Sequence, residues 1–185
     1  MASTTDFKNG LTIEMDGDVY QIVEFQHVKP GKGGAFVRTR LRKFSTGQVI
    51  DKTFRAGEKI EVARVDRRPL QYLYQSGDDF MFMDNDTFDQ VALTKEQIGP
   101  QVKFLKDNLE VLVASYDGRI LGVDLPDTIE ALVSQTDPGL KGDTASGGSK
   151  PATIETGAVI TVPLFINEGD RIRVDTRSEK YIERV

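Results

Sequence analysis

Hydrophobic and polar residues alternate along much of the chain, in short runs that turn-forming residues separate. The clearest run is 36–42, in which Val37, Thr39 and Leu41 alternate with three arginines. A period of two places successive side chains on opposite faces, which is typical of a β-strand. We therefore predict a strand here, with one face toward a core and a basic face outward.

The first 64 residues contain several runs of this kind. Strands are predicted at 12–15, 19–25, 36–42, 48–54 and 60–63. Asp16-Gly17-Asp18 separates the first two runs, and Asp-Gly is a strong hairpin signal because it tolerates the positive φ angles of a tight turn. Five or so short strands in so few residues favour a small β-barrel.

The remaining sequence continues in the same way. A second set of strands is predicted at 70–75, 80–83, 91–93, 110–116 and 119–123, and a third at 128–134, 158–162, 171–176 and 180–182. One helical turn interrupts the second set, because Thr94 and Gln97 have the spacing of a capping box while Gly99-Pro100 limits its length. The connection at 139–151 is long and rich in small residues, so it is either functional or disordered. Small β-barrels packed end to end are the simplest architecture.

The loop at 27–36 places one lysine, Lys32, between the two strongest strand predictions. Pro30 fixes φ, and the glycines at 31, 33 and 34 allow positive φ, so the backbone can turn sharply on both sides of the lysine. An ammonium presented in this way suits contact with a crowded anionic target, and it suits a modifying enzyme that must reach the side chain. A solvated hairpin tip is the alternative interpretation.

The surrounding segment is basic. No Asp or Glu occurs from Phe25 to Ile50, whereas the same stretch contains Lys29, Lys32, Arg38, Arg40, Arg42 and Lys43. The three arginines share one face of the strand predicted at 36–42. Phosphate backbones attract such stripes through counterion release, so we predict RNA contacts here. The alternative, an ordinary charged outer sheet face, is weakened by the absence of acids.

Charge is spread unevenly along the chain. The net charge of −5 divides into +3 for residues 1–64, −6 for residues 65–127 and −2 for residues 128–185. One end could therefore bind nucleic acid while the rest keeps the protein soluble. There is no cysteine, which excludes disulfides, thiolate metal sites and a cysteine nucleophile. No apolar run is long enough for a membrane span, so a soluble cytoplasmic protein is expected.

Catalytic and cofactor motifs find no support in the sequence. His27 is the only histidine and no Gly-x-Ser-x-Gly element accompanies it, so a serine hydrolase is not indicated. Gly31-Lys32-Gly33 lacks the order of a phosphate-binding P-loop. Asp84–Asp89 faintly resembles a calcium loop, but the glycine is missing and Lys95 replaces the final Glu. We expect no metal, no cofactor and no enzymatic activity.

Several motifs together resemble one protein family. They are the loop Lys29-Pro30-Gly31-Lys32-Gly33, the segment 35–38, and the segments 52–58, 70–74, 141–145, 150–153, 156–158 and 162–166. In this order they are similar to bacterial translation elongation factor P along the whole chain. The resemblance implies an all-β fold: an SH3-like (KOW-like) domain at 1–64, an OB-like domain at 65–127 and a C-terminal OB-like domain at 128–185, in an L-shaped, tRNA-like arrangement.

The resemblance also implies a function. The family binds the bacterial ribosome next to the peptidyl-site tRNA and relieves stalling at consecutive prolines. Lys32 matches the tip residue that a lysine-modifying enzyme extends in many members and that reaches the tRNA acceptor end. The segment 142–148 aligns with a loop that faces the exit-site mRNA codon, which makes Asp143, Thr144, Gly147 and Gly148 candidate RNA contacts. A monomer that avoids membranes is expected.

A general single-stranded nucleic-acid binder with OB-like barrels is the competing interpretation. Such a protein needs aromatic platforms among basic residues. Phe36 is the only aromatic residue between Lys29 and Lys43, and both later domains are net acidic. The sequence therefore favours the translation factor.

Overall fold

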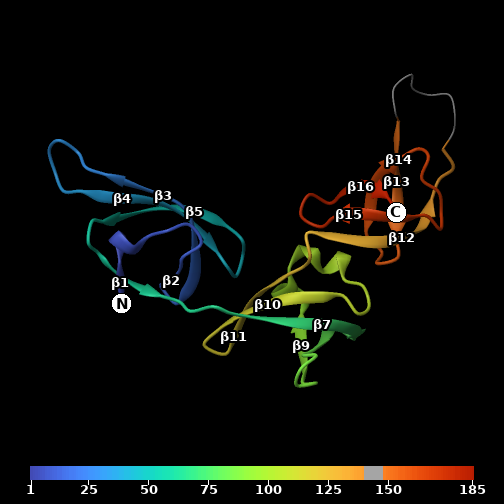
Figure 1. Cartoon of the computed structure of the whole chain (residues 1–185), viewed down its shortest axis with the longest axis horizontal. Helices are drawn as coiled ribbons and strands as arrows, with labels where there is room; N and C mark the ends of the chain where they lie inside the picture. Colours follow the sequence, from blue (N-terminus) through green and yellow to red (C-terminus); the bar gives the residue numbers. More distant parts are fainter. Residues whose placement is uncertain (140–147) are drawn as a thin grey trace. The chain divides into compact units, whose positions relative to one another are not determined.

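The computed structural model describes residues 1–139 and 148–185, and strands dominate both ranges (Figure 1). Contacts divide the chain into two compact units: residues 1–67 with 113–122, and residues 68–112 with 123–185. The predicted all-β class is confirmed. The predicted domain boundaries stay a prediction, although the strands do fall into three sheets.

The first sheet has the order β1-β6-β2-β3-β4-β5. Its strands are β1 (Ala2–Ser3), β2 (Thr12–Met15), β3 (Asp18–Val28), β4 (Phe36–Lys43), β5 (Val49–Arg55) and β6 (Lys59–Val62). The 3-10 helix η1 (Thr4–Asp6) directly follows β1. Thr4 is fully buried, and its hydroxyl accepts the Gly57 N–H at 2.8 Å, so η1 is held against the end of β5.

The inner face of this sheet forms a core of alternating residues. Its buried members are Phe7, Ile13, Tyr20, Ile22, Val37, Leu41, Phe54 and Ile60. Val37, Thr39 and Leu41 of β4 are buried as predicted, and the arginines between them are exposed. The alternation in the sequence therefore identified the core face of β4.

Tight turns occur at Asp-Gly pairs. Asp16 and Gly17 have φ angles of 53° and 79°, which fits a two-residue turn with positive φ at both positions. Asp117 and Gly118 repeat this geometry, with φ angles of 49° and 73°. Both hairpins were predicted from the sequence. Asp18 itself belongs to the strand that follows the first turn.

The second sheet has the order β11-β10-β7-β8-β9. Its strands are β7 (Asp66–Ser76), β8 (Asp79–Met83), β9 (Gln90–Thr94), β10 (Glu110–Tyr116) and β11 (Arg119–Asp124). The predicted capping box is present: the Thr94 hydroxyl accepts from the Gln97 N–H, and the Gln97 side chain accepts from the Thr94 N–H. The helix α1 (Lys95–Ile98) ends at Gly99, and the 3-10 helix η2 (Pro100–Phe104) follows.

The third sheet has the order β14-β13-β12-β15-β16. Its strands are β12 (Thr128–Thr136), β13 (Ser149–Ile154), β14 (Val159–Pro163), β15 (Arg171–Asp175) and β16 (Lys180–Arg184). The two outer strands, β14 and β16, also contact each other, which makes the sheet barrel-like. The predicted small barrels are confirmed in this respect.

Strand β13 corrects the prediction for the connection at 139–151. The connection was predicted because 139–151 is long and rich in small residues, and no strand was predicted in 149–154. Pro151 lacks an N–H, which a strand tolerates only where no donor is needed. In the structure the pairing of β13 with β12 ends at Ala152, so the missing donor is not needed there. The Pro151 carbonyl accepts instead from the Thr136 hydroxyl at 2.9 Å.

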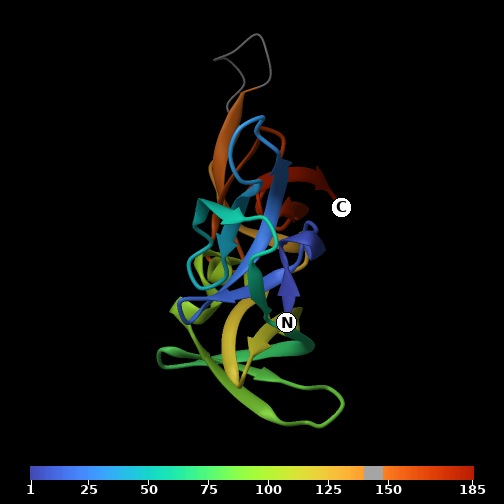
Figure 2. The same cartoon turned by 90° about the vertical axis from the view of Figure 1, so that its left-hand side faces the viewer.

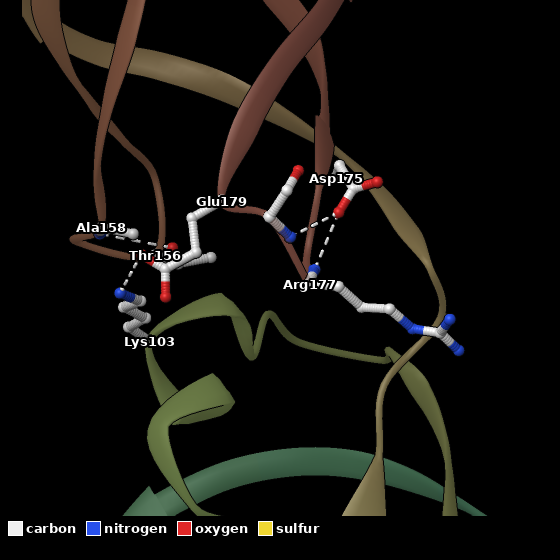
Figure 3. A network of polar contacts seen from close by, with 7 residues as sticks. Lys103, Thr156, Ala158, Asp175, Arg177 and Glu179 are labelled. Atoms are coloured by element: carbon white, nitrogen blue, oxygen red, sulfur yellow. Dashed lines mark hydrogen bonds and ion pairs between the residues drawn. The ribbon is translucent and has the colours of Figure 1, made fainter. Parts of the chain in front are cut away.

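Polar contacts join elements of the second unit (Figure 3). The Lys103 ammonium of η2 donates to the Glu179 carboxylate at 2.6 Å, and Lys106 Nζ donates to the Glu130 carbonyl at the same distance. In the turn before β16, one oxygen of Asp175 accepts from two backbone N–H groups. The N–H of Ser178, the stronger of these donors, holds the pKa of Asp175 below its usual value.

Within the first unit, the β10–β11 hairpin contacts β2 through a tyrosine. The Tyr116 hydroxyl donates to Oε2 of Glu14 at 2.6 Å. This hydrogen bond, together with burial and nearby acids, raises the pKa of Tyr116 to about 12. The folded protein therefore binds the phenolic proton more tightly than the unfolded chain does.

This bond gives stability a pH dependence at high pH. Because the folded-state pKa of Tyr116 lies above the unfolded value of about 10, its contribution is complete below pH 10 and disappears as pH rises through about 12. We expect the free energy of unfolding to fall less steeply over this range in Tyr116→Phe than in the wild type. Urea denaturation at several pH values from 9 to 12 measures this free energy. The same pH dependence in both proteins would show that the hydrogen bond does not raise the pKa of Tyr116.

Candidate RNA interface on the first sheet

The predicted lysine loop lies at the end of the longest hairpin of the first sheet. Pairing of β3 with β4 continues to Val28 and Phe36, and the loop extends beyond that pair (Figure 1). Lys29, Lys32 and the loop glycines are all exposed. The hairpin therefore carries the loop away from the core.

Only one of the three loop glycines uses its conformational freedom. Gly33 has a φ of 112°, which L-residues rarely adopt, whereas neither Gly31 nor Gly34 has a positive φ. A Cβ atom at Gly33 would also lie 3.9 Å from the Pro30 ring. Gly33 is thus the residue whose backbone sets the turn beside Lys32.

Lys32 has no carboxylate partner among the residues that the structure describes. Among residues 1–139 and 148–185, no ion pair or hydrogen bond involves the ammonium group of Lys29 or Lys32. An exposed amine without an internal partner is available to an external anion. This is the arrangement that the sequence predicted for the tip of the loop.

The three arginines of β4 differ in their surroundings, although all point outward. Arg40 lies 3.8 Å from Glu24 and 3.7 Å from Asp51. Arg42 donates to the Gln21 side chain at 2.9 Å. Arg38 has no acid partner in the described part of the chain, and its guanidinium stacks 5.5 Å from the Phe36 ring centre.

The predicted acid-free stripe is therefore only partly correct. Glu24 and Asp51 lie just outside the acid-free stretch of sequence, but strand pairing places both opposite Arg40. Lys43 is likewise paired, since its ammonium lies 2.8 Å from Asp18, and this hydrogen bond raises the pKa of Lys43. Exposed ion pairs contribute only about 0–1 kcal/mol, so Arg40 can exchange its partners for a phosphate.

An open pocket of about 390 Å³ lies on this arginine face, across β3, β4 and β5. Arg38 and Thr53 line its outer side together with the Arg40 ion pairs. The pocket is wide enough for a phosphate or sugar, and Arg38 is the cation of its outer side that such a group would meet without a paired acid. Lys52 also borders the pocket, but it pairs with the buried Thr39 and its ammonium lies 5.6 Å from the ring centre of Phe54, so it belongs to the opposite face of the sheet.

Comparisons with known proteins cover the whole chain. Models of three domains match: "Elongation factor P (EF-P) KOW-like domain" at residues 3–60, "Elongation factor P (EF-P) OB domain" at 65–123 and "Elongation factor P, C-terminal" at 129–184. Elongation factor P of Moorella thermoacetica is 59% identical over 184 residues, which is 100% of both chains. That of Rhodococcus erythropolis is 56% identical over 100% of this chain and 99% of its own.

The chain belongs to the elongation factor P family. It is therefore a translation elongation factor and not a classical enzyme. Among solved structures, "Eukaryotic translation initiation factor 5A from Methanococcus jannaschii" is similar, with a TM-score of 0.54 and 28% identity over 66% of this chain and 92% of that chain. The resemblance inferred from the sequence is confirmed.

The elongation factor P resemblance also predicted RNA contacts near the C-terminus. Asp143, Thr144 and Gly147 lie outside the described residues, and Gly148 is half-buried just before β13. Next to it, the buried Lys150 donates its ammonium to the Asp137 carbonyl at 2.5 Å. Sequence reasoning missed this structural lysine, because nothing in the pattern distinguishes it from a solvated one.

Other ligands find little support in the described ranges 1–139 and 148–185. No group of three or more His, Asp or Glu side chains there is placed to hold a metal ion. No helix in these ranges is long and apolar enough to cross a membrane. The absence of a cofactor stays a prediction.

The glycine geometry predicts unequal effects of two matched substitutions. Gly33→Ala places a side chain at φ 112° and should lower the free energy of unfolding by about 1 kcal/mol. Gly31→Ala meets no atom within 4 Å and has no positive φ, so its effect should be close to zero. Urea denaturation measures both, and equal effects would show that Gly33 does not set the turn.

Proposed function

We propose that this protein binds the ribosome next to the peptidyl-tRNA and promotes peptide-bond formation at consecutive prolines. Lys32 stabilises the acceptor end of that tRNA. The observation that carries this proposal is the exposed, unpaired ammonium of Lys32, held beyond the β3–β4 hairpin. Membership of the elongation factor P family supports it.

The physical reason lies in positioning. Proline is a poor amine acceptor and a rigid donor, so a peptidyl-tRNA that ends in proline rarely samples the productive geometry. Holding the acceptor end still removes part of the entropic barrier, and such proximity effects reach about 7–11 kcal/mol in favourable cases. Only a fraction of this is needed, since the ribosome supplies the chemistry.

The loop also suits enzymatic extension of Lys32. Its glycine neighbours carry no side chains, and a Cβ at Gly31 or Gly34 would meet no atom within 4 Å. A lysine-modifying enzyme can therefore approach from either side. Such an extension lengthens the reach of the amine toward the acceptor end. The intact mass of the protein from its native host identifies the group.

The remaining contacts follow from charge. Lys29, Arg38, Arg40 and Arg42 hold phosphates of the tRNA or of ribosomal RNA beside the loop. Asp143, Thr144, Gly147 and Gly148 contact the exit-site mRNA codon. The protein acts as a monomer in the cytoplasm, and it makes no membrane contact.

Replacement of the tip residue tests the proposal. Lys32→Ala should lower the yield of a Pro-Pro-Pro reporter in reconstituted translation at least about tenfold, while a reporter without prolines is unaffected. Lys95→Ala, at an exposed lysine of α1, is the matched control and should retain full activity. Circular dichroism should show both variants folded. Normal synthesis through Pro-Pro-Pro with folded Lys32→Ala would refute the proposed role.

The arginine face predicts a second, graded result. Arg38→Ala should weaken ribosome binding more than Arg40→Ala does, because Glu24 and Asp51 already offset the charge of Arg40. Each phosphate contact that is lost lowers the slope of log affinity against log salt by about 1. Binding titrations with purified ribosomes at several salt concentrations measure both the affinities and these slopes.

The double substitution Glu24→Gln with Asp51→Asn provides the complementary arm. It frees Arg40 without removing a cation, so ribosome affinity should rise. Unchanged affinity in all three variants would show that this face lies away from RNA.

A general single-stranded nucleic-acid binder is the competing function. It predicts that the protein shifts free oligonucleotides in a gel at moderate salt, without ribosomes. The ribosomal factor should leave free oligonucleotides unshifted under these conditions and bind ribosomes that carry peptidyl-tRNA.

A further inference from the structure

The strand that leads into the lysine loop contains one more residue than its partner strand can pair. Ile22 of β3 lies opposite Leu41 and Glu24 lies opposite Arg40, so Val23 has no partner of its own on β4. Two residues of β3 thus face one residue of β4, which defines a β-bulge. The β3–β4 hairpin that contains this bulge can be followed in blue in Figure 2, from the turn after β2 to the lysine loop.

The irregularity is confined to β3. Strand β4 pairs with β5 over residues 36–42 without any shift of register. On its other edge β3 pairs with β2 over residues 18–21, and the Ile22 N–H then donates to the Leu11 carbonyl at 2.9 Å. In the described part of the chain, the ladder of β3 beyond Val23 is with β4 alone. The bulge therefore lies at the point where β3 leaves β2.

The side chain of Val23 contributes little to the core. It is 43% exposed, whereas the preceding Ile22 is buried. The following Glu24 is exposed as well, and its carboxylate lies 3.8 Å from Arg40. The effect of Val23 on the fold is therefore exerted through the backbone of β3.

The bulge corrects the alternation of faces along β3. Tyr20 and Ile22 are buried in the core of the first sheet, and Phe25 packs against the same core. Side chains of a regular strand alternate with a period of two, so positions 22 and 25 would lie on opposite faces. The unpaired residue brings them to the same face. Removal of Val23 would therefore leave every other side chain of β3 on its present face.

A bulge also bends its strand and increases the local twist. Because β5 holds β4 in a regular ladder, the bulge changes the direction of β3 relative to β4. The five residues from Val23 to Val28, the last paired residue of β3, span about 17 Å. A change in direction of about 20°, a common angle between neighbouring strands, moves a point at that distance by about 6 Å.

A movement of this size matters for a group that acts by position. Misplacement of a positioned group by about 1 Å can cost about 100-fold in rate. Lys32 follows Val28 by only four residues, so the direction of β3 decides where the loop begins. The geometry at Val23 is thus large enough in its effect to decide where the ammonium is presented.

We propose that the bulge at Val23 is a positioning device, which sets the direction in which β3 enters the lysine loop and so brings Lys32 to the acceptor end of the peptidyl-tRNA. Val23 acts through the backbone and makes no contact with RNA itself. The inference rests on the proposed function, because it assigns the direction of Lys32 to a residue outside the lysine loop.

Deletion of Val23 tests the device, since it removes the bulge and keeps the other side chains of β3 on their faces. Circular dichroism should show a folded protein. In reconstituted translation the yield through Pro-Pro-Pro should fall at least about tenfold, although Lys32 is still present. A saturating concentration of the folded variant should not restore the yield, whereas it would restore a loss caused by instability. Restoration at saturation, or a normal yield throughout, would overturn the proposal.

Two substitutions at the same position provide the matched comparison. Val23→Ala and Val23→Gly both remove the side chain and keep the residue count, so the bulge remains. Only glycine also frees the backbone of the bulge. We expect full activity at Pro-Pro-Pro with Val23→Ala and about threefold less with Val23→Gly. Equal activities of the two variants would overturn the proposal, and this pair decides the matter if the deletion variant does not fold.

Protection of an open strand edge is the competing role for this bulge, because bulges also prevent edge-to-edge pairing between chains. Gel filtration of the deletion variant separates the two roles. Self-association together with a fully active monomer fraction would show edge protection alone and would overturn the proposal. We expect the monomer fraction itself to be defective at Pro-Pro-Pro.

The control with Lys32→Ala separates failure of this inference from failure of the proposed function. If Lys32→Ala is defective at Pro-Pro-Pro and the deletion of Val23 is not, the inference fails and the proposed function stands. If Lys32→Ala supports normal synthesis through Pro-Pro-Pro, the proposed function fails, and the inference fails with it.

Discussion

The pairing of β3 with β4 is the interaction on which the proposed site depends. It continues from Tyr20 opposite Lys43 to Val28 opposite Phe36, so both legs of the lysine loop begin from fixed positions. Burial of Val37 and Leu41 on the inner face stabilises this pairing, at about 1.5–3 kcal/mol for each side chain. The same alternation necessarily places the arginines on the outer face.

A single structural solution thus serves stability and charge presentation. The apolar side of β4 completes a core. The arginines on its polar side stay in water, so the fold does not lose their hydration free energy. Lys32 lies beyond the last strand pair, and within residues 1–139 and 148–185 no carboxylate forms an ion pair with it. Glu24 and Asp51 both lie opposite Arg40, further from the lysine loop than the last strand pair of Val28 with Phe36. Neither acid forms an ion pair with Lys32.

Much of this arrangement was predictable because its causes are local. Alternation in 36–42 revealed the buried face, Asp16-Gly17 the turn, and Thr94 with Gln97 the helix start. The ion pairs of Arg40 were not predictable from composition, since strand register decides which distant residue lies opposite. Strand β13 was missed for a related reason: only tertiary pairing shows that Pro151 lies past the end of one ladder.

Phe88 marks a place where local rules and the structure disagree. The sequence predicted an acidic turn at 84–89, and the structure contains one, but no pattern announces an exposed ring at positive φ. Conformational strain of this kind appears only in the backbone angles. Disagreement between local preference and observed geometry is typical of functional surfaces.

Electron cryomicroscopy of the native protein on ribosomes stalled with peptidyl-prolyl-tRNA is the most direct measurement of the role of Lys32. The map should show the β3–β4 hairpin in the cavity beside the peptidyl-tRNA, with side-chain density from Lys32 in contact with the acceptor end. A map in which the protein is bound but its lysine loop points into solvent, or contacts only protein, would contradict that role.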